Sequence, residues 1–407
     1  MLTSGTVYAG VDSPQAWWRL VAAVVLSTIG GAGMWSVPVV LPAVQAEFGV
    51  ARADAALPYT LAMIGFALGG VAMGRLSDRL GIVVPVLCGI GALGIGFTTA
   101  GLAPNLSVLA LSYALIGLGT SATFGPLIAD ISQWFTLRRG IAVAIASSGN
   151  YLAGVVWPPA LHHAMAAEGW RATHIGVGVF CVLTMLPLLL AMRRRAPMQG
   201  FDQTDAFAAG TQRDLGLSPN ALQAVLFVAG LSCCVAMSMP QVHIVAYCGD
   251  LGYGVARGAE MLSLMLGFGI FSRIASGFVA DRIGGVATLL LSSSLQAVAL
   301  LFYLFFDGLA SLYVISALFG LFQGGLVPMY AIIVREYFPP KEAGTRLGII
   351  LMATLLGMAL GGWMSGVIFD LTGSYQAAFA NGLLWNLLNI SIAIWLLMRP
   401  GPRVAPA

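Results

Sequence analysis

Long apolar stretches alternate with short polar segments along the whole chain. Twelve stretches are long enough to cross a membrane, because a helix needs about 20 largely apolar residues to span a hydrocarbon core of about 30 Å. Glycine and proline interrupt several of them, which membrane helices tolerate when neighbouring helices satisfy the freed backbone groups. The pattern predicts an all-α polytopic membrane protein with twelve transmembrane helices, at residues 18–41, 57–76, 82–102, 106–129, 141–163, 173–192, 220–247, 259–280, 286–306, 311–334, 345–368 and 376–398.

Composition excludes the soluble and disordered classes. Of the 407 residues, 59% are hydrophobic and only 9% are charged, namely 19 Lys or Arg and 16 Asp or Glu. An ordinary soluble domain has about 25% charged residues, and a disordered chain needs low hydrophobicity and high charge. The net charge of +3 is too small to indicate a nucleic-acid partner. The outer surface is therefore expected to face lipid.

The basic residues predict the orientation of the chain. With both termini and the even-numbered loops on one side, the other side has only Arg52, Arg171 and Arg257. Basic residues concentrate in cytoplasmic loops, so both termini are predicted to lie in the cytoplasm and the protein in the cell inner membrane. No cleaved signal peptide is expected before Trp17. The fifteen basic residues of the cytoplasmic side are Arg19, Arg75, Arg79, Arg138, Arg139, Arg193, Arg194, Arg195, Arg213, Arg282, Arg335, Lys341, Arg346, Arg399 and Arg403.

The longest polar stretch separates six predicted helices from six others. It runs from Arg193 to Pro219 and is too short and too poor in apolar residues to form a domain. We expect a first six-helix half at 1–192, a cytoplasmic linker at 193–219, a second half at 220–399 and a cytoplasmic tail at 400–407.

The two halves share a sequence repeat. Residues 74–81 and 277–284 both read Gly-x-x-x-Asp-Arg-x-Gly, and the offset of 203 residues is half the chain. The same offset places Gly117 on Gly320 and Gly154 on Gly357. A parallel repeat of this kind is typical of transporters that rock two halves about a central site.

The repeated octapeptides also suggest a gate. Their glycines would let helix ends approach closely, and paired charges at that interface would act as a latch. Asp130 is expected to pair with Arg75 or Arg79, and Glu336 with Arg282. The alternative is that these residues only set topology and form turns. The gating candidates are Gly74, Asp78, Arg79, Asp130, Gly277, Asp281, Arg282 and Glu336.

These features resemble the major facilitator superfamily over the whole chain. The two octapeptides look like the loop signature of that superfamily. Residues 134–142, WFTLRRGIA, and 148–154, SGNYLAG, are similar to the entry into the fifth span of its monocarboxylate porter group, which includes bacterial oxalate–formate antiporters. Leu41-Pro42 and Glu47-Phe48-Gly49 resemble the same group.

The resemblance implies transport of small organic anions such as lactate, pyruvate or oxalate, with a proton or in exchange. Many members have an arginine in span eight that meets the substrate carboxylate, and Arg273 is the matching residue here. Many animal members also have an aspartate four residues earlier, where this chain has Gly269. That departure removes the basis for proton coupling at this position.

Arg273 is also a candidate on physical grounds. It lies eight residues before Asp281, so at 1.5 Å per residue it is about 12 Å deeper in the membrane. An intramembrane arginine is costly and marks a functional site by default, and its planar fork matches a carboxylate. The alternative is that Arg273 reaches the cytoplasmic surface or binds backbone carbonyls of a broken helix.

Other polar and aromatic residues are candidates for the cavity. His243 and Tyr247 are one turn apart and share a helix face, and His243 is the leading candidate for proton coupling because histidine titrates near physiological pH. The resemblance places spans one, four, seven and ten around the cavity. Each further candidate is as readily explained by helix packing: Trp35, Phe124, Asn150, Tyr151, Gln323 and Tyr330.

The predicted function is secondary active transport of a monocarboxylate by alternating access, without cofactor or metal and as a monomer. One alternative keeps the fold but carries a larger aromatic acid, a vitamin or a drug-like substrate. A second is a non-transporting membrane sensor. A membrane-embedded enzyme would need clustered acids, His or Cys in the core, and the mid-membrane ionisable groups found are Arg273 and His243. The cysteines lack metal-ligand spacing and are expected to be packing residues: Cys88, Cys181, Cys233, Cys234 and Cys248.

Overall fold

The structure is a computed structural model that describes residues 11–193 and 216–399. In these ranges the chain forms helices only. Their bounds are α1 Pro14–Gly30, α2 Ala32–Phe48, α3 Arg52–Ala55, α4 Leu57–Leu80, α5 Val83–Gly101, α6 Leu106–Ala122, α7 Gly125–Trp134, α8 Arg139–Ala191, α9 Pro219–Asp250, α10 Val255–Ile283, α11 Gly285–Phe305, α12 Leu309–Gln323, α13 Leu326–Tyr337, α14 Pro340–Thr372 and α15 Tyr375–Met398.

The helix α8 contains two membrane crossings. Gly169 interrupts it with φ 78° and ψ 161°, a backbone conformation that favours glycine. The rings of Trp157 and Phe180 lie 5.9 Å apart, whereas 23 residues of straight helix would separate them by about 35 Å. The two arms therefore run side by side. Eleven helical stretches of the described ranges are apolar and long enough to span a membrane, and with α8 counted twice the predicted twelve crossings are confirmed.

Three of the predicted spans are broken into two helices. Span one is divided at Gly31 between α1 and α2, span four at Thr123 and Phe124 between α6 and α7, and span ten at Gly324 and Gly325 between α12 and α13. The last two breaks lie at nearly corresponding places in the repeat, because the offset of 203 residues carries Thr123 to Leu326, two residues after Gly324. Such interruptions free backbone groups inside the membrane, which is tolerated only where the protein surrounds them.

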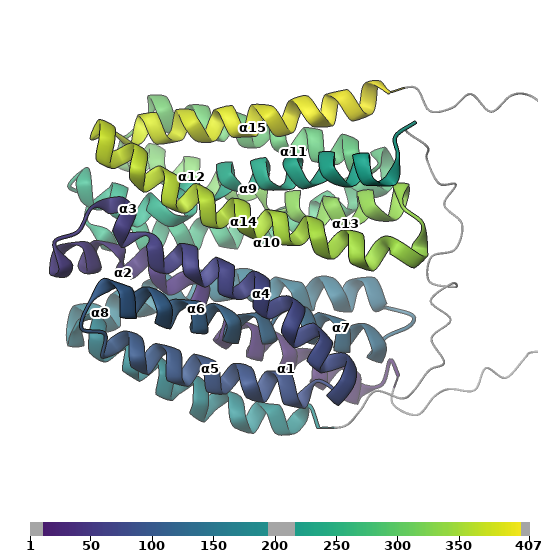
Figure 1. Cartoon of the computed structure of the whole chain (residues 1–407), viewed down its shortest axis with the longest axis horizontal. Helices are drawn as coiled ribbons and strands as arrows, with labels where there is room; N and C mark the ends of the chain where they lie inside the picture. The colour runs from purple at the N-terminus through teal and green to yellow at the C-terminus, as the bar shows by residue number, and fades with distance from the viewer. Residues whose placement is uncertain (1–10, 194–215, 400–407) are drawn as a thin grey trace, which may run out of the picture.

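The helices form two groups, α1–α8 and α9–α15, called here the first and second half (Figure 1). The start of α1, the end of α8, the start of α9 and the end of α15 lie at one end of the molecule, which we call the linker end. The short helix α3 lies at the opposite end, called the α3 end. Most of the predicted linker and the tail, with Arg194, Arg195, Arg213 and Arg403, lie outside the described residues.

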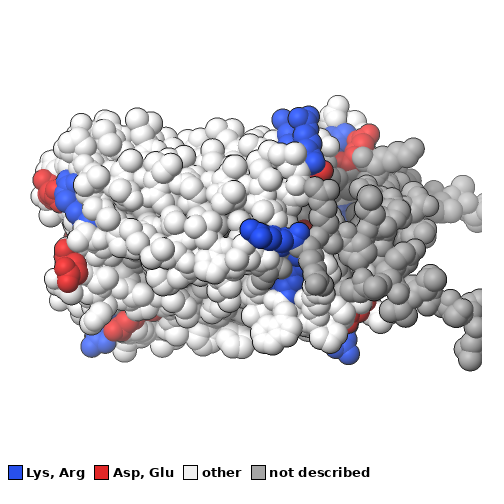
Figure 2. Space-filling view, turned by 90° about the horizontal axis from the view of Figure 1, so that it is seen from below, with Lys and Arg blue, Asp and Glu red and all other residues white. Residues whose placement is uncertain are grey.

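Charged side chains are concentrated at the two ends, and a broad band without them lies between (Figure 2). Large apolar side chains are exposed on the outer surface, among them Leu111 (66%), Leu183 (66%), Phe278 (69%) and Leu384 (67%). A soluble monomer rarely exposes apolar surface on this scale. The surface therefore matches a lipid environment, and the chain is a multi-pass membrane protein.

The sequence repeat corresponds to a repeat of close helix contacts. A Cβ atom added to Gly117 would lie 1.9 Å from the carbonyl oxygen of Ala62, and one added to Gly320 would lie 1.9 Å from that of Met265. Each residue of the second pair follows its counterpart by 203 positions. Only glycine fits at these crossings, so the same contact recurs in both halves.

The octapeptides end their helices in the same conformation. Gly81 caps α4 with φ 82° and Gly284 caps α10 with φ 85°, so both positions favour glycine. The first glycine of each octapeptide, Gly74 or Gly277, is not at a close helix contact, because a Cβ added there would meet nothing within 4 Å. The prediction that these two glycines allow a close helix approach is wrong.

The predicted partners of the gating acids are also wrong. Both carboxylate oxygens of Asp130 accept hydrogen bonds from Arg19, at 2.7 and 2.8 Å, instead of from Arg75 or Arg79. The Arg19 and Asp130 side chains are 3% and 9% exposed. Glu336 accepts from the backbone N–H of Gly285 at 3.0 Å, because α11 begins there with free N–H groups.

The start of α1 is held against the α7–α8 connection at the linker end. The Asp12 carboxylate accepts from the backbone N–H groups of Thr136 and Leu137, each at 3.1 Å, and the rings of Trp17 and Phe135 are 5.0 Å apart. Burial raises the pKa of Asp12, but the hydrogen bonds from Thr136 and Leu137 outweigh burial and hold this pKa below its usual range. These contacts support the buried Arg19–Asp130 pair.

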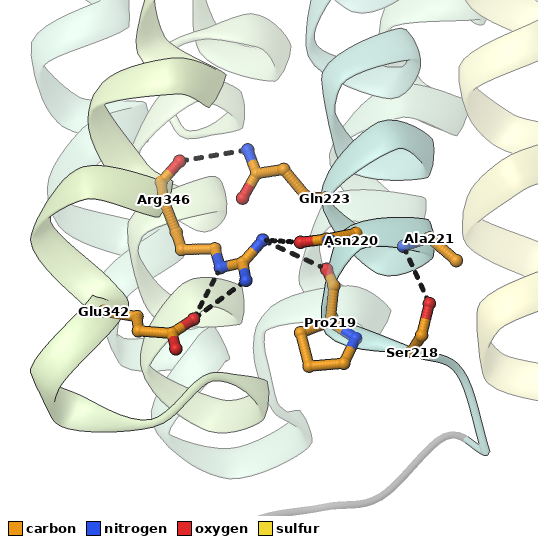
Figure 3. A network of polar contacts seen from close by, with 7 residues as sticks. All are labelled: Ser218, Pro219, Asn220, Ala221, Gln223, Glu342 and Arg346. Atoms are coloured by element: carbon orange, nitrogen blue, oxygen red, sulfur yellow. Dashed lines mark hydrogen bonds and ion pairs between the residues drawn. The ribbon is translucent and has the colours of Figure 1, made fainter.

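At the linker end of the second half, Arg346 joins α14 to α9 (Figure 3). Its guanidinium donates to Glu342 at 2.8 Å, in the same helix, and to the Asn220 side chain at 3.0 Å. The Gln223 amide donates to the backbone carbonyl of Arg346 at 3.2 Å. The α9 and α14 helices are therefore fixed to one another at this end.

We expect Asp130→Asn to destabilise the fold by about 3–5 kcal/mol, because it leaves the buried charge of Arg19 uncompensated. The measurement is the apparent melting temperature of the purified protein in detergent. Glu342→Gln is the control, since the Glu342 side chain is 53% exposed and a pair of this kind at the surface contributes only about 0–1 kcal/mol. Equal melting temperatures for the two variants would contradict this account of Asp130.

Candidate functional site

Arg273 lies between the two halves, where it binds backbone carbonyls. It projects from α10, and its Nη1 donates to the carbonyl of Ser147 in α8 at 3.2 Å. Its Nε donates to the carbonyl of Gly324 at 3.5 Å. The residue is half-buried, and no ion pair joins it to a carboxylate of residues 11–193 or 216–399. The charge of Arg273 is therefore held by the neutral dipoles of carbonyl groups from both halves.

The break between α12 and α13 provides one of these carbonyls. A Cβ on Gly324 would lie 2.3 Å from the carbonyl oxygen of Gly269, so α12 and α10 touch here through backbone atoms. The N–H of Gly325 is satisfied by the hydroxyl of Ser272 at 3.2 Å. The interruption thus frees the Gly324 carbonyl and places it beside Arg273 of the neighbouring helix.

Tyr151 covers the other side of Arg273. The guanidinium carbon is 4.2 Å from the centre of the Tyr151 ring, a distance typical of a cation–π contact. A Cβ on Gly269 would lie 2.4 Å from Cε1 of the same ring. The space of a side chain at position 269 is therefore filled by Tyr151, which gives a physical reason for glycine at this position.

Trp35 of α2 is bonded to Asn150, the residue that precedes Tyr151 in α8. The Trp35 indole N–H donates to the Asn150 carbonyl at 3.0 Å, and the Trp35 ring is buried. The Asn150 amide donates to the Met34 sulfur at 3.6 Å, while its Oδ1 has no partner in the described structure. Four predicted residues, Trp35, Asn150, Tyr151 and Arg273, are thus brought together.

The remaining predicted residues are distributed over other contacts. Phe124 packs against Phe66, with ring centres 6.0 Å apart, at the break between α6 and α7. Tyr330 donates to the Asn389 side chain at 3.2 Å inside the second half. Gln323 accepts from Gln241 of α9 at 3.0 Å, next to the Gly324 that binds Arg273.

His243 and Tyr247 lie towards the α3 end, in a separate cluster. One ring nitrogen of His243, Nε2, lies 2.8 Å from the Gly362 carbonyl, and Nδ1 lies 3.4 Å from the Tyr375 hydroxyl. The Tyr247 ring is 5.2 Å from the Tyr375 ring and 5.5 Å from Phe379. Both nitrogens of His243 are therefore engaged within the second half.

Sequence reasoning missed several buried polar residues. His174 lies between the Tyr113 hydroxyl and the Trp170 carbonyl, each at 2.7 Å. Gln241 and Arg52 are also buried. The only sequence signal is a polar residue within or beside an apolar stretch, and this signal does not reveal which distant helix supplies the partner.

Comparison with known proteins identifies the family of the chain. The family model described as Major Facilitator Superfamily matches residues 23–312 and 276–407. Monocarboxylate transporter 13 of Bos taurus is 28% identical over 331 residues, which cover 78% of this chain and 75% of the relative. Monocarboxylate transporter 11 of Mus musculus is 25% identical over 390 residues, 90% of this chain and 84% of the relative. These relatives are transporters and not enzymes.

Solved structures show the same fold. The crystal structure of the nucleoside transporter NupG aligns with a TM-score of 0.73 at 13% identity, over 93% of this chain and 99% of that one. A bacterial homologue of the human lysosomal transporter Spinster aligns with a TM-score of 0.67 at 18% identity, over 95% and 96% of the two chains. The match to the family model shows that the chain belongs to the Major Facilitator Superfamily, and it is similar to monocarboxylate transporters of that superfamily.

Proposed function

We propose that the protein is a secondary active transporter of small monocarboxylates, working by alternating access with a coupled proton or an exchanged anion. The observation that carries this proposal is Arg273. Its charge lies between the halves and is held by two carbonyls instead of a carboxylate. A substrate carboxylate would supply the missing charge and accept two parallel hydrogen bonds from the guanidinium.

The position of Arg273 supports a role in alternating access. Its two carbonyl partners, Ser147 and Gly324, belong to different halves, so movement of the halves would change its hydrogen bonds. A substrate that replaces these bonds would stabilise one arrangement of the halves over another. The similarity to monocarboxylate transporters favours an anion with one carboxylate.

The nearby residues would form the wall of the site. Trp35, Asn150 and Tyr151 would present an aromatic and amide surface from the first half. Gln323 would face them from the second half, next to Gly324. Such a wall suits a small organic acid with an apolar body behind its carboxylate.

The proposal also covers the moving units of the protein, its orientation in the membrane and its oligomeric state. Residues 1–192 and 220–399 would be the two moving units, joined by the linker 193–219, with the tail 400–407. The protein would lie in the inner membrane with its linker end on the cytoplasmic side. The gate on that side would include Asp78, Arg79, Asp281 and Arg282. The protein would act as a monomer.

We expect Arg273→Gln to lower uptake of the preferred acid at least about ten-fold, because a charge-assisted hydrogen bond contributes roughly 1.5–3 kcal/mol. The measurement is uptake by proteoliposomes of radiolabelled mono- and dicarboxylates, with and without a proton gradient. Arg257→Gln, an exposed residue paired with Glu260, is the control. Unchanged uptake in Arg273→Gln would overturn the site. If no acid in the panel moves, a non-transporting sensor or a larger cargo becomes the better interpretation.

Gly269→Ala should raise KM about ten-fold, equivalent to about 1.4 kcal/mol, because the new Cβ displaces Tyr151 from beside Arg273. Gly267→Ala in the same helix is the control, since its Cβ would lie an ordinary 3.5 Å from Val155. Concentration-dependent uptake of the same acid gives both KM values. A KM for Gly269→Ala equal to that of Gly267→Ala would remove Tyr151 from the site.

His243→Gln tests the proton-coupling proposal. Glutamine can still donate to the Gly362 carbonyl but does not titrate near neutral pH. We therefore expect uptake to lose its dependence on external pH, while exchange of labelled for unlabelled acid continues. A variant whose pH profile matches the parent would exclude His243 from coupling.

A further inference from the structure

Arg52 joins the two halves at the α3 end. It belongs to the short helix α3 of the first half and is only 6% exposed. Its guanidinium donates to the Tyr375 hydroxyl oxygen and forms an ion pair with Asp250 at 3.1 Å. The guanidinium carbon also lies 4.6 Å from the centre of the Phe369 ring. All three partners belong to the second half.

The backbone of α3 also depends on the second half. The two carboxylate oxygens of Asp370, in α14, accept from the N–H of Arg52 at 2.8 Å and from the N–H of Ala53 at 2.7 Å. The first N–H groups of a helix have no partner within that helix. Separation of the halves at this end would leave these groups without their present cap.

A chain of hydrogen bonds leads from Arg52 into the protein. Arg52 donates to the Tyr375 oxygen, the Tyr375 hydroxyl can then donate to Nδ1 of His243, and Nε2–H of His243 can donate to the Gly362 carbonyl. Gly362 is also where α14 meets α4, since a Cβ there would lie 3.0 Å from the Tyr59 ring. The interactions of Arg52 therefore extend to the packing of the two halves.

The other ion pairs of the described ranges do not cross between the halves. Arg19–Asp130 and Arg171–Glu47 lie within the first half, and Arg257–Glu260 and Arg346–Glu342 within the second. Arg52–Asp250 joins the halves, at a site where the arginine is withdrawn from solvent. Among the ion pairs between described residues, the one that joins the halves therefore lies at the α3 end.

We propose that Arg52 is the latch of the gate at the α3 end. Its bonds to Asp250 and Tyr375, and the bonds of Asp370 to the start of α3, hold this end closed in the present conformation. All of them must break before the site opens on this side. The latch depends on the alternating-access part of the proposed function and is independent of the cargo.

The latch is tested by the access of a thiol reagent to the contact between the halves. The reporter is Thr60→Cys, because the Thr60 hydroxyl donates to the Ala359 carbonyl of the opposite half at 3.2 Å. The five native cysteines are first replaced, since they would also react. A membrane-impermeant reagent is applied to sealed vesicles of each orientation, and the labelling rate of the reporter is measured without substrate.

In this background, Arg52→Gln should accelerate labelling from the α3 side at least about ten-fold, because loss of a buried charge partner destabilises the closed state that contained it. Arg52→Lys keeps the charge but lacks the planar fork, and should give a smaller increase. Arg257→Gln removes an arginine paired within the second half and should leave the rate unchanged.

Folding of each variant is checked by size-exclusion chromatography. A folded Arg52→Gln that labels at the parental rate would overturn the latch. If Arg52→Gln does not fold, Asp370→Asn is tested instead, and a parental rate in that variant has the same meaning. Faster labelling in a protein that transports no carboxylate would leave the latch in place and reject the proposed cargo.

Discussion

The structure depends on one constraint, that lipid supplies neither hydrogen-bond partners nor counter-charges to a buried polar group. Three buried or half-buried arginines satisfy it differently. Arg19 is paired with Asp130 inside the first half, and Arg52 is held by acids and a tyrosine of the second half. Arg273 is held by two carbonyl oxygens and the Tyr151 ring, without a carboxylate of the described residues. The first arrangement stabilises a half, the second joins the halves, and the third leaves a charge for which a substrate anion is a suitable partner.

The repeat provides a common framework on which an asymmetric site is built. Gly117 and Gly320 make the same close contact in the two halves, and spans four and ten are broken at nearly matching places. The position that matches Arg273 in the first half is Gly70, 203 residues earlier. The central charge therefore comes from the second half alone, while the first half contributes Trp35, Asn150 and Tyr151. In the proposed function, movement between the halves would therefore alter the site.

The sequence was sufficient to predict most of the fold and part of the site. Twelve spans follow from the length of the apolar stretches, since crossing lipid requires a minimum helix length. Arg273 can be identified from the sequence because a charged side chain within a membrane span is energetically costly and usually functional. Tyr151 was named, but its contact with the Arg273 charge was not, because it depends on the crossing of helices more than 100 residues apart. Arg52 appeared only as one of three basic residues in the loops opposite the termini.

The sequence by itself determined the number of crossings, the repeat and the scarcity of charge, because these follow from hydropathy and from one chain compared with itself. Only the tertiary structure decided which residues the buried polar side chains bind. Asp130 binds Arg19 instead of Arg75 or Arg79, and His243 belongs with Tyr375 and not with Arg273. Pairing depends on how helices cross and where they break, and residues such as Gly269 and Gly324 set that geometry through close backbone contacts. Hydropathy shows which stretches cross the membrane, but the partner of each buried polar group depends on the packing of the helices.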